Sequence, residues 1–203
     1  MDQTPLWFSI TATTIQTLTT VVAVIAAIIG VSAWKKQLRN TEDHGLVREL
    51  LLAAYRLRDG LQFIRNPWMQ VRSTDEKGVM LTNEARHLEV TKEYTSRVVE
   101  AASRRNNLEV KISEAEALWG EPVRSWFMPL IERHSELVVS VETHLDAIRP
   151  GEPTPTPDNA ELFKKSRKIV YSHSHSSPDE FDQGVIAALD GIREKLKPRM
   201  VAR

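Results

Sequence analysis

The chain has no cysteine, little glycine and few aromatic residues, and its charges show no excess of either sign. The absence of cysteine excludes disulfides, thiolate metal ligands and a cysteine nucleophile, and it is compatible with a cytoplasmic domain. Because 27 basic and 27 acidic residues cancel, the chain as a whole does not attract nucleic acid, which we do not expect as a partner. The abundant Leu, Ala, Glu, Arg and Lys favour an all-α fold over a sandwich or a barrel.

Charged residues are also missing from positions 3–34, and residues 21–29 are all aliphatic. A helix of about 20 apolar residues is long enough to cross the hydrocarbon core of a bilayer. We therefore predict a single N-terminal transmembrane helix at 12–34, preceded by a short extracytoplasmic N-terminus at 1–11. The lipid bilayer is thus an expected partner of this chain.

The charges on either side of this segment predict its orientation. Lys35, Lys36 and Arg39 follow it directly, whereas only Asp2 and the free amine precede it. Because positive residues concentrate on the cytoplasmic side, we expect the N-terminus outside and the C-terminal domain in the cytoplasm, at the inner membrane of a bacterium-like cell. Two alternatives fit less well. A signal peptide carries its positive charge before the apolar run, and a buried core helix rarely runs so long without a charge.

Small residues recur at helical spacing within the predicted span. Such stripes let two helices approach closely in a membrane, although Ala, Gly and Thr are common in membrane spans in general. The pattern predicts transmembrane self-association through Thr13, Thr17, Thr20, Ala23 and Ala27.

After the span, the hydrophobic period predicts a juxtamembrane helix at 35–65 that ends before Pro67. Arg65 and the other arginines of this helix are expected on solvated faces. A loop at 66–82 follows, in which Trp68 and Met69 are expected to cap the bundle rather than to face a partner. The stripe that we expect to be buried comprises Leu46, Leu50, Ala53, Leu57, Leu61 and Ile64.

Residues 83–203 are predicted to form an elongated antiparallel helical bundle. Ser177 is expected to cap the last helix, and Pro198 is expected to end it. The pattern at 168–172 fits either the end of a helix or a short strand. The helices are expected at about 83–119, 121–148, 159–172 and 177–197.

The six histidines are the main candidates for metal ligation or acid–base chemistry. His134 and His144 share one predicted helix but lie about 15 Å apart along its axis, too far to bind a single metal. We expect each to be a hydrogen-bonded core residue. His173 and His175 have a spacing that can hold a metal only with carboxylates from elsewhere. We predict no metal site, no cofactor and no catalytic residue, because the chain has no phosphate-binding loop and no hydrolase or metalloprotease motif.

The densest basic run is a candidate contact for phosphates or for anionic lipid headgroups. A solvated helix face that balances nearby acidic residues is the alternative interpretation. The run consists of Lys164, Lys165, Arg167 and Lys168.

Two short segments pair an arginine with a histidine at a distance of five or six positions, Arg39 with His44 and Arg167 with His173. This pattern is similar to that of the HEPN ribonucleases, all-helical proteins whose active site uses an arginine and a histidine on one helix. The resemblance implies that His44 or His173 would belong to a ribonuclease site. Matches this short are expected by chance at this composition, so the chain is not assigned to that family.

These observations predict a single-pass membrane-anchored protein whose cytoplasmic helical domain acts as an interaction or scaffold module. Its expected partner is another protein or a second copy of the chain. One alternative is an oligomerising, membrane-perturbing effector of the toxin or defence type, since the outer half of the span is rich in threonine. A membrane-tethered HEPN-like ribonuclease is the other. Binding is favoured over catalysis because no catalytic motif is present.

Overall fold

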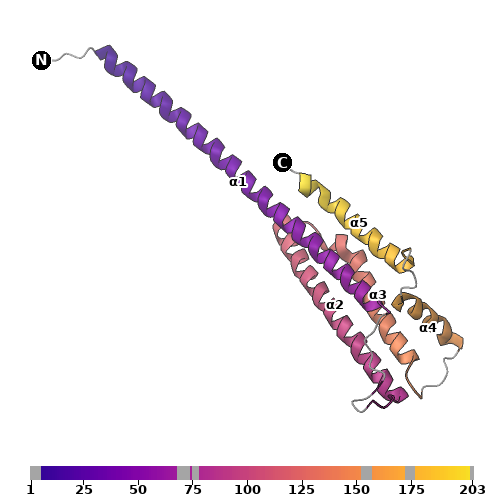
Figure 1. Cartoon of the computed structure of the whole chain (residues 1–203). Coiled ribbons are helices and arrows are strands. Elements are labelled where there is room, and N and C mark those ends of the chain that lie inside the picture. Colours follow the sequence, from indigo (N-terminus) through magenta and orange to yellow (C-terminus); the bar gives the residue numbers. More distant parts are fainter. Residues whose placement is uncertain (1–5, 68–73, 75–77, 152–156, 172–176, 202–203) are drawn as a thin grey trace. The chain divides into compact units, whose positions relative to one another are not determined.

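In this computed structural model the described residues are 6–67, 74, 78–151, 157–171 and 177–201, and they fold into five α-helices (Figure 1). Within these ranges there is no named strand, and the one isolated bridge pairs Thr74 with Met80. The predicted all-α fold with a helical bundle is therefore confirmed. The helices are α1 (Leu6–Arg65), α2 (Asn83–Trp119), α3 (Arg124–Ala147), α4 (Pro157–Val170) and α5 (Glu180–Val201).

The described chain divides into two compact units, one up to residue 45 and one at 46–201. The first unit is the N-terminal part of α1. The second, which we call the bundle, contains the last part of α1 and all of α2 to α5. The backbone is helical throughout α1, so the predicted span and the predicted juxtamembrane helix belong to one element.

The transmembrane prediction for 12–34 falls within the first unit. The side chains of 12–18, 21–22 and 32–33 lie outside the described residues. Taken over the residues that are described, none of the helices combines the length and the apolar character needed to cross a bilayer. The described part of the structure therefore does not support the predicted transmembrane helix.

Apolar side chains of α1, α2, α3 and α5, with Val170 of α4, form the core of the bundle. The predicted stripe of α1, from Leu46 to Ile64, is buried, with no member more than 8% exposed. Burying an aliphatic side chain contributes about 1.5–3 kcal/mol, so these stripes supply most of the attraction between helices. The inner face of α5 is buried in the same way, through Phe181, Val185, Leu189, Ile192 and Leu196.

Helices α1 and α2 approach each other closely at Gly60. A Cβ atom at this position would lie 3.1 Å from Cδ of Arg104 and 3.4 Å from Cα of Ala101. Arg104 also donates a hydrogen bond to the carbonyl of Arg56 at 3.1 Å, which joins the two helices on the same side. The missing side chain at Gly60 therefore lets the helices pack at short range.

The ends of α2 follow familiar capping chemistry. The hydroxyl of Thr82 accepts a hydrogen bond from the Ala85 N–H at 3.2 Å, and Gly120 ends the helix in the left-handed region with φ 67°. Helix α3 begins at Arg124 rather than at the expected residue 121, and its first N–H donates to Glu116 at 2.8 Å. A side chain of α2 thus satisfies a backbone donor at the start of α3.

Helix α4 agrees with one of the two alternatives left open at 168–172, whereas α5 differs from the expectation at two points. Helix α4 continues to Val170, so residues 168–170 form the end of a helix. Asp179 rather than Ser177 caps α5, because its carboxylate accepts the Asp182 N–H at 3.0 Å. Pro198 lies inside α5, which continues to Val201.

A tertiary contact explains why α5 continues beyond Pro198. A proline removes one backbone hydrogen bond and normally weakens the turn around it. Arg199 donates to Glu121 at 2.7 Å, and its guanidinium lies 4.2 Å from the ring centre of Trp119. These contacts hold the last turn of α5 against the end of α2.

Candidate functional site

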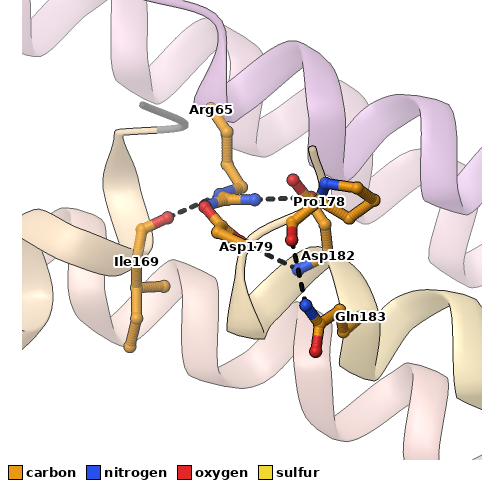
Figure 2. A network of polar contacts seen from close by, with 6 residues as sticks. All are labelled: Arg65, Ile169, Pro178, Asp179, Asp182 and Gln183. Carbon is orange, nitrogen blue, oxygen red and sulfur yellow. Dashed lines mark hydrogen bonds and ion pairs between the residues drawn. The ribbon is translucent and has the colours of Figure 1, made fainter. Parts of the chain in front are cut away.

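A buried arginine at the end of α1 joins three helices of the bundle. The Arg65 side chain is only 1% exposed, and its guanidinium ion-pairs with Asp179 and Asp182 (Figure 2). It also donates to the carbonyl of Ile169 at 2.6 Å and lies 4.6 Å from the ring centre of Phe181. One side chain thus connects the end of α1 with the end of α4 and the start of α5.

The electrostatics of Asp179 follow from this arrangement. Burial alone would raise the pKa of its carboxyl group, because it penalises the charged form. Hydrogen bonds from Arg65 and from the backbone N–H groups of Asp182 and Phe181, together with the charge of Arg65, outweigh burial and hold the pKa below its ordinary value. The carboxylate is therefore charged at neutral pH and serves both as ion-pair partner and as helix cap.

The prediction for Arg65 was wrong, since this residue is buried rather than solvated. Two weak signals in the sequence could have identified it. Arg65 lies four positions after Leu61 of the buried stripe, and Asp179 and Asp182 stand three apart where a helix starts. Neither signal says that the two acids face Arg65, because that depends on how α5 packs against α1.

A groove of about 390 Å³ lies beside this network, between α3, α4 and the start of α5. Three cationic side chains line it, those of Arg133, Lys165 and Lys168, and Ile169 and Phe181 supply apolar surface. Ile169 and Phe181 also contact Arg65, so the buried network fixes two walls of the groove. The sequence did not single out Arg133 as a site residue.

The carboxylates of the groove are mostly paired already. Glu136 accepts a hydrogen bond from Arg133 at 2.6 Å, and Asp179 is paired with Arg65. Among the described residues, Glu180 is the one acidic group lining the groove without an ion-pair partner. Lys165 and Lys168, the two lysines that line the groove, form no ion pair with any described residue either.

The predicted basic run lies on α4, and all four of its side chains are exposed: Lys164, Lys165, Arg167 and Lys168. Only two of them, Lys165 and Lys168, line the groove. Contact of this run with an anion stays a prediction.

Two predicted core histidines are buried in α3, and their surroundings differ. His144 is 3.1 Å from the Tyr171 hydroxyl and meets the ring of Tyr94 edge-on. Neither ring nitrogen of His134 has a hydrogen-bond partner among the described residues, contrary to the prediction for this side chain. Burial lowers the pKa of both histidines, and the positive charges of Arg105 and Arg167 lower the pKa of His134 and His144 further, respectively.

The remaining predicted site residues lie either on α1 or outside the described residues. His44 is exposed on α1, and the candidates His173 and His175 lie outside the described residues. In the described ranges, no group of three or more His, Asp or Glu side chains is placed to hold a metal ion. Of the self-association stripe, the side chains of Thr13 and Thr17 lie outside the described set, and those of Thr20, Ala23 and Ala27 are exposed on α1.

No protein-family model, curated protein or solved structure matches this chain.

Proposed function

We propose that this chain is a membrane-anchored helical docking module. In this proposal segment 12–34 inserts into a lipid bilayer, and the bundle at 46–201 binds a protein partner or a second copy of the chain. The observation that carries the proposal is a set of aliphatic side chains on α1, each more than half exposed: Val24, Ile25, Ile28, Ile29 and Val31.

The composition of this part of α1 favours insertion across the membrane over adsorption to its surface. Helices that lie in the interface have a charged face opposite their apolar face. Residues 3–34 have no charge on any face, and Ala23, Ala26 and Ala27 occupy the positions between the larger aliphatic residues. Lys35 follows the uncharged segment directly on its C-terminal side. This arrangement supports an N-terminus outside and a bundle in the cytoplasm at a cell inner membrane, because positive residues concentrate on the cytoplasmic side.

A docking role for the bundle is supported by the groove between α3, α4 and α5 and by the two lysines that line it, which form no ion pair with any described residue. Tethering the bundle to a membrane raises its effective concentration for any partner that is bound to the same membrane. Such a module therefore needs only a modest affinity for its partner.

Membrane fractionation with matched lysine substitutions tests the anchor. Val24→Lys with Ile28→Lys places two charges in the proposed span. Each charge should make the free energy of membrane insertion less favourable by about 2.5–3.5 kcal/mol. The control is Val99→Lys with Val110→Lys, because these valines are equally exposed but lie on α2 of the bundle. Wild type and control should stay in the membrane pellet after carbonate extraction, whereas the α1 variant should move to the soluble fraction.

A wild-type chain found in the soluble fraction would contradict the anchor.

Protease access to tags at the two ends, measured in whole cells, tests the proposed orientation. Cross-linking within the membrane tests self-association, which Ala23→Leu with Ala27→Leu should reduce. Dye leakage from vesicles containing the wild-type chain would favour the membrane-perturbing effector instead.

A further inference from the structure

The basic residues of α4 differ from those of α2 in how they are neutralised. On α2, Arg97, Arg104 and Arg105 each pair with a glutamate of the same helix. On α4, none of the four basic side chains forms an ion pair with any described residue. The bundle therefore presents four basic side chains on one short helix, and none of them is neutralised by an ion pair within the described chain.

Two of these cations line the groove together with a third. Lys165 and Lys168 stand three positions apart, so they lie on the same side of α4 one turn apart. Arg133 faces the same groove from α3. Its guanidinium passes close over Gly184 of α5, where a Cβ atom would lie only 3.0 Å from Nε. The absence of a side chain at Gly184 thus leaves room for Arg133 beside the groove.

We infer that Lys165 and Lys168, together with Arg133 of α3, which also pairs with Glu136, form a binding site for a phosphate group. An ammonium group is a compact charge with three donors, and two of them one helical turn apart can bridge the oxygens of one phosphate. Because Glu136 and Asp179 are already paired, they add little repulsion toward an incoming anion, and Glu180 is the one acidic residue of the groove that would oppose it. Ile169 and Phe181 offer apolar contact for whatever carries the phosphate.

This inference goes beyond the docking role and does not require the anchor. The bound phosphate group could belong either to a lipid headgroup or to a soluble phosphate, and two experiments distinguish these sources. Isothermal titration of the full-length chain with inorganic phosphate probes the soluble source. Sedimentation with phosphatidylcholine vesicles, with and without phosphatidylglycerol, probes the lipid source. Binding to phosphatidylcholine alone reports on the anchor, so failure of the anchor is distinguishable from failure of this site.

Two variants of equal charge provide the decisive comparison. Lys165→Gln with Lys168→Gln removes the cations of the groove, and Lys164→Gln with Arg167→Gln removes two cations of α4 outside it. The groove variant should lose about tenfold in affinity for inorganic phosphate, or about tenfold in the increase of vesicle binding that phosphatidylglycerol produces. The reason is that hydrogen bonds to charged groups are strong. The control variant should change either quantity less than about threefold. Equal losses in both variants, or no saturable binding in either arm, would overturn the inference.

Discussion

Arg65 and Asp179 are separated by 114 positions in sequence, yet their side chains form an ion pair that joins the last residue of α1 to the residue before α5. Asp182 completes the arrangement from the first turn of α5, at 2.5 Å from the same guanidinium (Figure 2). The carboxylates are 28% and 21% exposed, whereas the arginine is almost fully buried. The pair therefore lies at the edge of the core, with its positive side inward.

Arg65→Met should destabilise the bundle by about 2–4 kcal/mol, because it leaves two carboxylates and the Ile169 carbonyl without their donor. Urea unfolding of the full-length chain in a mild detergent, followed by circular dichroism, measures the change. Arg149→Met is the matched control, since the pair of Arg149 with Asp146 is exposed on both sides. That variant should cost less than about 1 kcal/mol. Equal effects of the two substitutions would show that burial of Arg65 adds no stability.

The two carboxylates that face Arg65 should differ in their contribution. Asp179 caps α5 in addition to pairing with Arg65, whereas the carboxylate of Asp182 pairs with Arg65 and, among the described residues, caps no helix. Asp179→Ala should therefore cost about 1 kcal/mol more than Asp182→Ala, the usual contribution of an N-cap. The same urea experiment measures both values. If Asp182→Ala proves the more harmful, the assignment of Asp179 as the cap is wrong.

The sequence predicted the buried stripe of α1 well because its cause is local. A helix repeats every 3.6 residues, so the stripe from Leu46 to Ile64 can be recognised without knowing what covers it. The start of α5 shows where this reasoning ends. Ser177 and Asp179 are both good caps, and the choice between them depends on Arg65, which arrives from a distant helix.

Pro198 shows the same limit at the other end of α5. Local reasoning predicts that proline ends the helix. The helix continues because Arg199 contacts Trp119 and Glu121, which belong to the end of α2 and the turn after it. The candidate groove was predictable only in part: the run on α4 was visible in sequence, but the approach of Arg133 from α3 was not.

The stability of the bundle should fall as the pH drops below about 6.5, the ordinary pKa of histidine. Burial, assisted by Arg105, lowers the pKa of His134 in the folded state, so the unfolded chain binds more protons in this range. The contribution of His134 is fully present above pH 6.5 and is lost as the pH falls through the lowered pKa. Because the pKa of His144 is lowered as well, both residues contribute to the slope.

His134→Leu should therefore flatten the dependence of the unfolding free energy on pH between 7 and the acid range. Leucine suits the site, because neither ring nitrogen of His134 has a partner among the described residues. The variant should gain stability relative to wild type as the pH falls, and His144→Phe in the same chain should remove much of the remaining slope. Urea unfolding at a series of pH values measures both effects. An unchanged slope in His134→Leu would mean that this histidine does not titrate differently in the two states.

The packing of α1 against α2 should depend on the size of the side chain at position 60, because the two helices approach closely at Gly60. Gly60→Leu should destabilise the bundle by about 1–3 kcal/mol, because the larger side chain forces the helices apart. Gly60→Ala should be nearly neutral. Alanine has a higher helix propensity than glycine, which stabilises α1. This gain is offset because the new Cβ atom comes close to the Arg104 side chain, which must move slightly.

The control for this site is Gly191→Ala on α5, where a Cβ atom would meet nothing within 4 Å. This substitution should stabilise the bundle by about 0.5–1 kcal/mol, because alanine loses less backbone freedom in a helix than glycine does. Thermal unfolding of the three variants beside wild type separates the two effects. If Gly60→Leu is tolerated as well as Gly191→Ala, then α1 and α2 do not meet at Gly60, and the buried face of α1 must be covered in another register.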